Sequence, residues 1–330
     1  MHIYQYNIFK RETNSAGGKA KNDVSQVLFD EGIKDLYIPS KFRLIRLLQQ
    51  LCGVSFLAKD SIVFVQYPAV IPPYISKLRR RISSKGKLVA IIHDLDSLRN
   101  TMKAHQELEV LNNFDILIVH NKSMQKYIND IGYQGEIIIL EIFDYLHNVN
   151  RKVIESKLEK SICFAGNLDK SIFVKKLNKV KNLHFNLYGI TKNPQEIESE
   201  KVKFRGKYSS EEIVFKLEGG FGLIWDGDSL ETCDGVIGNY QRYNNPHKLS
   251  LYIASEKPVI VWKDAAIADF VQDNNIGLVV NNLFEIEQKI NELSKEDYEE
   301  MLNNVVELKR KISKGFFTKR AVSKIINKLV

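Results

Sequence analysis

Short apolar runs alternate with helical segments along the whole chain. The apolar runs carry few charges, as strands do when both faces of a parallel sheet are covered. In the first half, strands are predicted at 2–6, 62–67, 87–92, 116–120 and 136–140, and helices at 22–31, 42–52, 74–82, 102–112 and 123–131. In the second half, strands are predicted at 162–165, 183–188, 221–225, 259–262 and 278–280, and helices at 170–180, 210–217, 248–254, 265–272, 283–293 and 295–311. This alternation predicts an α/β fold with doubly wound parallel sheets.

The length of 330 residues indicates two domains rather than one. A polar, charged stretch at 147–161 has no strand pattern and is the predicted linker, which gives an N-terminal domain at 1–150 and a C-terminal domain at 151–330. Both domains are predicted to be Rossmann-like sheets that face each other. An amphipathic last helix at 316–330 is expected to pack against the N-terminal domain or against another copy of the chain.

The net charge of +8 favours anionic partners such as nucleotide phosphates, anionic lipid or nucleic acid. The basic run from Lys77 to Lys87 is either a solvated helix end or an anchor for anionic lipid or a charged acceptor. The three cysteines have no paired or zinc-binding spacing, which favours a reduced setting. The polar N-terminus is unlike a signal peptide, and no apolar stretch reaches the roughly 18 residues of a transmembrane helix. We therefore expect a cytoplasmic protein that touches a membrane at most from its inner face.

Familiar nucleotide-binding motifs are absent. The chain has neither the GxxxxGK loop of P-loop NTPases nor a GxGxxG after its first strand, which argues against both an NTPase and a nicotinamide enzyme. Signatures of nucleic-acid-binding modules are also absent, and the basic run has no interleaved aromatic residues. A nucleic-acid partner is therefore not expected.

The segment Gly17-Gly18-Lys19 precedes the first predicted helix. Glycines allow a backbone to approach a phosphate or a sugar closely, especially where a helix begins. The segment is therefore interpreted either as a loop that contacts a phosphate or a sugar, such as that of an acceptor, or as a plain flexible connection.

The strand at 87–92 runs directly into His93, Asp94 and Asp96. Ligands of open parallel sheets bind at the carboxyl ends of the strands, where one of these side chains could act as a general base. Histidine and aspartate also suit several metal ions. Alternatively, either aspartate could cap the next helix.

Two helix starts in the second half could bind a pyrophosphate, because free amides and the helix dipole favour anions there. The residues at these starts are Gly166, Asn167 and Lys170, and then Asn245, His247 and Lys248. Proline at 246 fits a first helical turn. Lys248 opposes the helix dipole, so a compensating anion is expected beside it, and a phosphate would fit.

Four acids follow the strand at 221–225, namely Asp226, Asp228, Glu231 and Asp234. Their spacing does not match an EF-hand loop. They could bind a divalent ion, or they could accept hydrogen bonds from sugar hydroxyls.

Together these segments resemble bacterial glycosyltransferases with the GT-B fold. The resemblance is strongest to the β-1,6-galactofuranosyltransferases of O-antigen synthesis and weaker to the streptococcal glucosyltransferases that extend sugars on serine-rich adhesins. It covers nearly the whole chain and is carried by FGLIWDGDSLETC (221–233), NNPHKLSLYIASEKPVIVW (244–262) and AAIADFVQDNNIGLVV (265–280). Supporting segments are IHDLDSLR (92–99), IFDYL (142–146), FAGNL (164–168) and AGGKAKND (16–23).

The resemblance implies two Rossmann-like domains with a cleft between them, the nucleotide sugar on the C-terminal domain and the acceptor on the N-terminal one. It also implies that the turn at 166–170, with His247 and Lys248, lies beside the UDP. Such enzymes usually need no metal ion. The EX7E pattern common in retaining members does not occur within 221–280, the part of the second half that carries the resemblance, which agrees with inversion.

We therefore expect an inverting, metal-independent and cofactor-free transfer of galactofuranose from UDP-galactofuranose to a hydroxyl of a growing surface glycan, which we expect to be lipid-linked. Asp94 is the first candidate for the base and Asp96 the second. Lys248 and the turn at 166–167 would stabilise the leaving pyrophosphate, and Asp226, Asp228 and Glu231 would bind sugar hydroxyls. The alternatives are a glucosyltransferase that uses UDP-glucose on a glycoprotein, and a non-catalytic subunit that binds nucleotide sugars.

Overall fold

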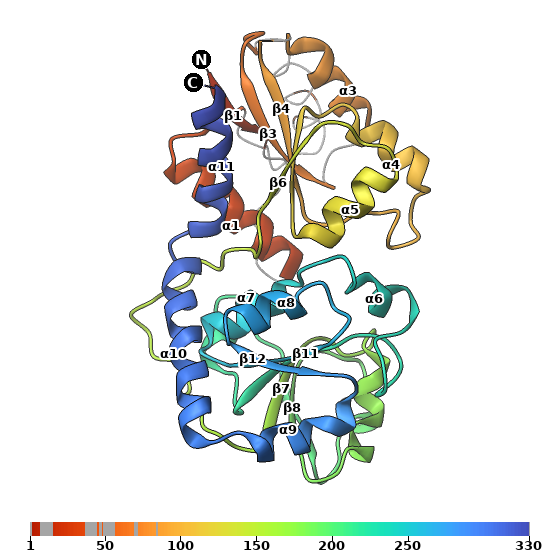
Figure 1. Ribbon diagram of the computed structural model, residues 1–330, viewed down its shortest axis with the longest axis vertical. Coiled ribbons are helices and arrows are strands. Elements are labelled where there is room, and N and C mark those ends of the chain that lie inside the picture. The colour runs from red at the N-terminus through yellow and green to blue at the C-terminus, as the bar shows by residue number, and fades with distance from the viewer. Residues whose placement is uncertain are drawn as a thin grey trace. The chain divides into compact units, whose positions relative to one another are not determined.

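The computed structural model describes residues 2–6, 16–36, 45, 48, 57–68, 72–83 and 85–329. These residues form two compact units, each built on a six-stranded parallel sheet (Figure 1). The first unit comprises the described residues within Met1–Glu12, Gly17–Phe143 and Gly315–Val330, and the second comprises those within Thr13–Ala16 and Asp144–Lys314. The predicted α/β class with doubly wound sheets is confirmed.

The first sheet has the strand order β2-β1-β3-β4-β5-β6, and each pair is parallel. Its strands are β1 (Ile3–Tyr6), β2 (Lys34–Asp35), β3 (Ile62–Tyr67), β4 (Lys87–Ile92), β5 (Ile116–Val119) and β6 (Glu136–Ile139). The helices of this unit are α1 (Ala16–Asp30), α3 (Pro72–Arg81), α4 (Ala104–Leu111), α5 (Lys122–Asp130) and α11 (Phe316–Leu329).

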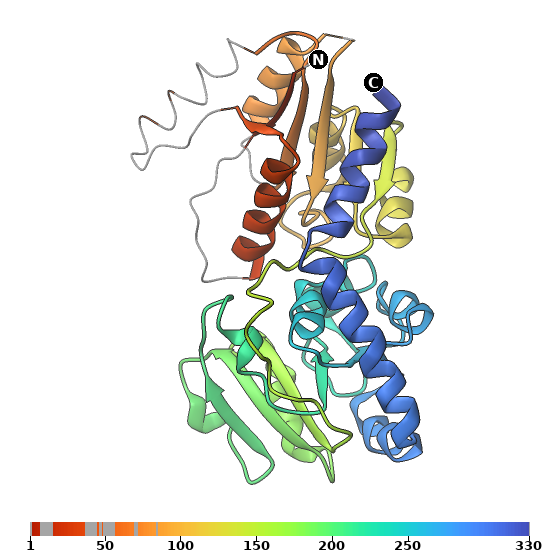
Figure 2. The ribbon, with the colours of Figure 1, turned by 90° about the vertical axis from the view of Figure 1, so that its left-hand side faces the viewer.

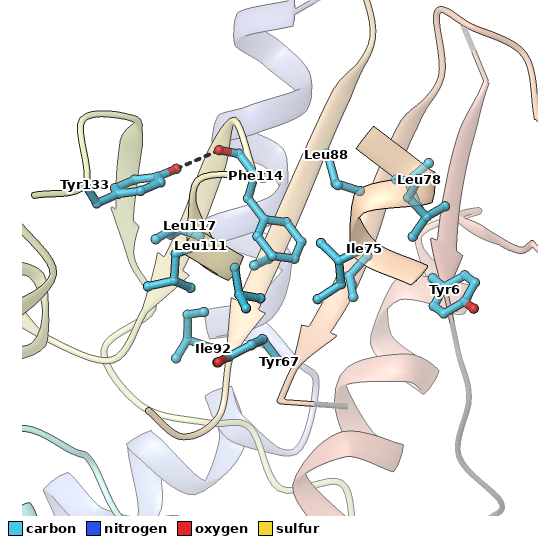
Figure 3. Close-up of a cluster of buried hydrophobic side chains, with 14 of the residues drawn as sticks. Tyr6, Tyr67, Ile75, Leu78, Leu88, Ile92, Leu111, Phe114, Leu117 and Tyr133 are labelled. Carbon is cyan, nitrogen blue, oxygen red and sulfur yellow. Dashed lines mark hydrogen bonds between the residues drawn. The ribbon is translucent and has the colours of Figure 1, made fainter. Parts of the chain in front are cut away.

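One face of the first sheet packs against α3, α4 and α5, and Figure 3 shows the part of this layer around Ile75 and Leu111. Alternate strand residues such as Val63, Leu88 and Leu117 point into this layer and are fully buried. They meet Ile75 of α3 and Leu111 of α4. Burial of each aliphatic side chain contributes roughly 1.5–3 kcal/mol. The central strands are therefore held rigidly, and their carboxyl ends have fixed positions.

The second sheet has the order β12-β11-β10-β7-β8-β9, again with parallel pairs. Its strands are β7 (Ser161–Asn167), β8 (His184–Ile190), β9 (Val202–Gly206), β10 (Phe221–Ile224), β11 (Val259–Trp262) and β12 (Gly277–Val280). Its α-helices are α6 (Gly235–Tyr240), α7 (His247–Ala254), α8 (Ala268–Asp273), α9 (Ile286–Glu292) and α10 (Lys295–Ile312). Short 3-10 helices lie at Ile172–Lys179, Pro194–Glu196, Ile213–Phe215 and Leu283–Glu285. Trp225 and Trp262 pack edge to face in the core of this unit.

The last helix, α11, belongs to the first unit, although the whole second unit precedes it in the chain (Figures 1 and 2). Its buried residues include Phe317, Ala321 and Ile325. Lys319 forms an ion pair of 3.1 Å with Glu31 after α1. The first unit is thus assembled from chain segments on both sides of the second, whereas the sequence placed a single boundary near residue 150.

Several predicted elements differ from the structure. The helix predicted at 22–31 begins at Ala16, and the helices predicted at 170–180 and 210–217 are short 3-10 segments. The strands β2 and β9 and the helix α6 were not predicted. β9 is an edge strand whose exposed Lys203 and Arg205 alternate with less polar residues, so its sequence lacks the continuous apolar run of a buried strand. The helix predicted at 42–52 lies mostly outside the described residues.

Candidate active site

The carboxyl ends of β7 and β8 open into a cavity of about 400 Å³ in the second unit. Its wall includes Gly166, Asn167 and Lys170 after β7, and His247 and Lys248 at the start of α7. The structure therefore brings both predicted helix starts to one cavity. A cavity at the strand ends of an open α/β sheet is the usual position of a ligand site.

Two glycines keep this cavity open. Gly189 at the end of β8 has φ +132°, and a Cβ atom there would lie 1.8 Å from the carbonyl oxygen of Gly166. A Cβ atom on Gly166 would lie 3.3 Å from Cε of Lys248. Close approach of the two strand ends thus depends on glycine at 189. Asn167 accepts hydrogen bonds from the amides of Asp169 and Lys170 at 3.1 and 3.2 Å, so its side chain caps its own turn.

Tyr252 fixes α7 on the sheet, and with it the position of Lys248. Its hydroxyl donates to Leu223 O of β10 at 3.0 Å and accepts from Ala165 N of β7 at 3.0 Å. Its ring lies over Gly222, where a Cβ atom would lie 2.3 Å from the ring. One buried tyrosine therefore joins α7 to the neighbouring strands β7 and β10.

Lys248 does have the compensating anion that its position predicts, but this anion is a side chain. Lys248 Nζ lies 2.9 Å from Asp226 Oδ2, and the two side chains are only 17% and 18% exposed. Ser171 donates to the other carboxylate oxygen at 3.1 Å, and the Phe164 ring centroid lies 4.7 Å from Nζ. The helix start therefore presents an ion pair to the cavity.

The other acids of this loop have different positions. Asp234 accepts from the amides of Asp228 and Ser229 at 2.6 and 3.2 Å and so closes the turn around Gly227. Asp228 and Glu231 are exposed and are not part of the cavity wall. Of the three acids expected to bind sugar hydroxyls, this cavity therefore includes only Asp226, and the role of Asp228 and Glu231 stays a prediction.

Residues that the sequence did not single out complete the wall. The Tyr145 ring stacks on the His247 ring with centroids 5.0 Å apart, and its hydroxyl donates to Ser210 O at 2.5 Å. Tyr208 and Lys207 also line the cavity. Asn245, predicted at the site, is buried and lies outside this wall. Tyr145 belongs to the IFDYL segment, whose only signal was the resemblance.

In the first unit, the predicted residues follow β4 as expected. His93 is buried, its Nε2 lies 2.7 Å from Gln66 Oε1, and its ring stacks on Phe143 with centroids 4.8 Å apart. The amide of Gln66 donates to Lys21 O and Ser25 Oγ, so the glutamine connects the ring to α1. Asp94 is 37% exposed and forms an ion pair of 3.1 Å with Arg99. His93 is thus a positioned inner residue, whereas the Asp94 carboxylate is accessible.

Neither aspartate caps the next helix, since the residue before α4 is Lys103. The loop is held instead by Glu107 of α4, which is fully buried. Its carboxylate accepts from Asp96 N at 2.7 Å, Ser97 N at 3.0 Å and Tyr67 Oη at 3.0 Å, and also from Ser97 Oγ. Glu107 therefore fixes the backbone of the predicted catalytic loop, a role that the sequence did not reveal.

The predicted glycine loop is wrong as a loop, because Gly17, Gly18 and Lys19 lie in the first turns of α1. Lys19 is buried and pairs with Asp23 one turn later, at 2.6 Å. The lysine that faces the β4 end is Lys21, which donates to Pro68 O at 2.8 Å. Burial lowers the pKa of Lys21, and the charges of Asp94 and Asp96 oppose this shift.

His120 and Cys233 are reactive residue types that the structure makes inert. His120 donates from Nε2 to Ile92 O at 3.0 Å, and its burial lowers its pKa to about 4. Burial raises the pKa of the Cys233 thiol to about 12. The imidazole is thus neutral and the thiol protonated near pH 7, so neither offers an acid or a nucleophile.

Among the residues that the structure describes, no group of three or more His, Cys, Asp or Glu side chains has the geometry to hold a metal ion. Metal independence itself stays a prediction. None of the described helices has the length and apolar character needed to span a bilayer.

Two parallel six-stranded sheets in one chain, the second with a cavity at its strand ends, are the architecture of the GT-B fold class. A solved glycosyltransferase involved in avilamycin A biosynthesis has a similar fold, with a TM-score of 0.63 and 12% sequence identity. The match covers 100% of this chain and 98% of that one.

The chain belongs to the glucosyltransferase 3-like family, whose N-terminal and C-terminal domain models match residues 1–142 and 162–325. It is 32% identical to a β-1,6-galactofuranosyltransferase of Escherichia coli strain K12, over 99% of both chains. It is 24% identical to glucosyltransferase 3 of Streptococcus parasanguinis, over 99% of this chain and 98% of that one. The resemblance read from the sequence is confirmed.

Proposed function

We propose that the protein transfers galactofuranose from UDP-galactofuranose to a hydroxyl of a growing surface glycan, with inversion and without a metal ion. The cavity beside Lys248 carries this proposal, because it offers a lysine, a helix N-terminus and glycine-lined strand ends to a diphosphate. The choice of galactofuranose follows the relative that is 32% identical, rather than the glucosyltransferase at 24%.

In this proposal the second unit binds the donor and the first unit binds the acceptor and supplies the base. Asp94 removes the proton of the acceptor hydroxyl as that oxygen attacks the anomeric carbon, and Asp96 is the second candidate. The bond from the anomeric carbon to the terminal phosphate oxygen breaks, and its electron pair leaves with UDP. Lys248 and the amides at the start of α7 stabilise this charge, while Asp226 accepts from a donor hydroxyl.

Purified protein with an acceptor glycan tests the reaction with UDP-galactofuranose, UDP-galactose and UDP-glucose, each with and without EDTA. We expect transfer from UDP-galactofuranose that EDTA leaves unchanged, and loss of activity in EDTA would contradict the metal-free mechanism. Preference for UDP-glucose would favour the glucosyltransferase, and UDP binding without turnover would favour the non-catalytic subunit.

The base is tested with a matched pair of variants. Asp94→Asn should lower kcat by about 10²-fold or more, since general base catalysis contributes on that scale. Asp130→Asn is the control, because Asp130 is also an accessible carboxylate in an ion pair, with Lys126 at 2.6 Å. Full activity in Asp94→Asn would move the base role to Asp96.

We also propose that the acceptor is lipid-linked and that α3 contacts an anionic membrane surface from the cytoplasmic side. Arg79, Arg80 and Arg81 form the last turn of α3. Arg79 is neutralised by Asp115 at 2.5 Å, so Arg80 and the neighbouring lysines are the residues proposed to meet lipid. Co-sedimentation with phosphatidylglycerol vesicles should fall when Arg80 and Lys85 are replaced by glutamine, and unchanged sedimentation would contradict this contact.

A further inference from the structure

In the proposed complex, the phosphates of the donor lie beside an acidic side chain, Asp226. Asp226 and Lys248 both line the cavity, and their ion pair of 2.9 Å is mostly shielded from water. The pair is held from three sides, by Ser171 on the carboxylate, by the Phe164 ring under the ammonium and by the Tyr252 anchor of α7. An incoming phosphate therefore meets Lys248 together with a fixed negative charge.

The remaining cations of the cavity are differently placed. Among the described residues of its wall, Lys170 and Lys207 are the other lysines, and both are exposed. Their charges are screened by solvent, whereas charges inside a partly buried site interact more strongly. The electrostatic preference of the inner cavity is therefore set mainly by the Lys248–Asp226 pair.

We infer that Asp226 makes the cavity prefer a nucleoside diphosphate whose terminal phosphate is esterified over the free nucleoside diphosphate. This inference rests on the proposed function, in which the terminal phosphate contacts Lys248. When the sugar leaves, the oxygen that joined it to phosphorus keeps the electron pair. The terminal phosphate then gains close to one negative charge at neutral pH, since such phosphates have a second pKa near 6.

That extra charge forms beside Lys248 and therefore close to the Asp226 carboxylate. Two like charges in one partly buried site repel each other. In the nucleotide sugar, the terminal phosphate carries less negative charge, so its repulsion from Asp226 is weaker. Asp226 thus weakens binding of the product more than binding of the substrate, which speeds product release and limits inhibition by the product.

Calorimetry with UDP and with the methyl ester of its terminal phosphate tests this inference, because the two ligands differ in charge and neither carries a sugar. Asp226→Asn keeps the shape of the side chain and removes its charge. We expect Asp226→Asn to raise the ratio of the affinity for UDP to the affinity for the ester by about tenfold. Ser171→Ala, which removes the hydrogen bond but keeps the charge, should leave the ratio of the two affinities as in the wild type.

Glu211→Gln is the matched control for net charge, since Glu211 is exposed and adjoins the wall residue Ser210. It should leave the ratio unchanged. An equal change for both ligands in Asp226→Asn would overturn the inference while leaving the nucleotide site intact. Failure of the wild type to bind either ligand would overturn the proposed function and the inference with it. Native emission of Trp225, adjacent to the substitution, verifies that the variant is folded.

Discussion

Replacement of His120 by glutamine should remove much of the acid sensitivity of the first unit. Burial lowers the pKa of His120 to about 4, from an ordinary value of 6.5. Between these values the unfolded chain binds a proton that the folded chain does not. Stability therefore falls as the pH falls from 6.5 to 4 and levels off below 4. The gap between the two values corresponds to a loss of about 3 kcal/mol, which is a large part of a typical domain's stability.

The assay can separate the two units, because both tryptophans of the chain, Trp225 and Trp262, lie in the second. Urea unfolding followed by circular dichroism reports on both units, and tryptophan emission reports on the second alone. Glutamine at 120 can still donate to Ile92 O, so the hydrogen bond is kept while the titration is lost. Between pH 7 and 4, the wild type should lose about 3 kcal/mol more than His120→Gln in the circular dichroism transition of the first unit. Parallel losses in both proteins would refute the reasoning.

Two other substitutions, Gly189→Ala and Glu107→Gln, each with a control variant, test the backbone that positions the two sites. Gly189→Ala forces the strand ends apart, so it should destabilise the second unit by about 2–4 kcal/mol and abolish UDP binding. Gly17→Ala, in open space on α1, should instead stabilise the first unit by about 0.5–1 kcal/mol. A wild-type melting curve for Gly189→Ala would contradict the close approach of Gly189 to the Gly166 carbonyl. Glu107→Gln turns an amide donor toward the amides of the 96–97 loop and should cost about 2–3 kcal/mol, whereas exposed Glu109→Gln should have little effect. Equal stability of these two glutamine variants would show that Glu107 does not hold the loop.

The central strands were predictable because their sequence carries its own signal. β3, β4 and β11 begin and end where the apolar runs do, since strands covered on both faces admit few charges. The edge strands β2 and β9 have no such signal. β9 alternates charged with less polar residues because one of its sides faces solvent, and β2 is only two residues long.

The site was predictable where a residue's environment follows from its place in an element. A lysine at a helix start opposes the helix dipole, so a neighbouring anion was expected beside Lys248, and Asp226 is that anion. The sequence could not show which acid pairs with Lys248, because four candidates lie within nine residues. The turn at Gly227 decides which one faces inward. Glu107 was invisible for a similar reason, since a glutamate in a helix is ordinarily exposed and only the fold brings four donors to it.

The return of the chain to the first unit at Gly315 affects the order in which the protein is made. During synthesis the ribosome completes all six strands of the first sheet early, but α11 emerges only after the whole second unit has been translated. Domains generally fold as they leave the ribosome. Nearly all of the second unit, residues 144–314, can therefore fold from contiguous chain. Until α11 is made, the nascent first unit exposes the apolar surface that Phe317, Val322 and Ile325 later cover. A chain stopped before residue 315 would thus leave its N-terminal part, rather than its C-terminal part, dependent on chaperones.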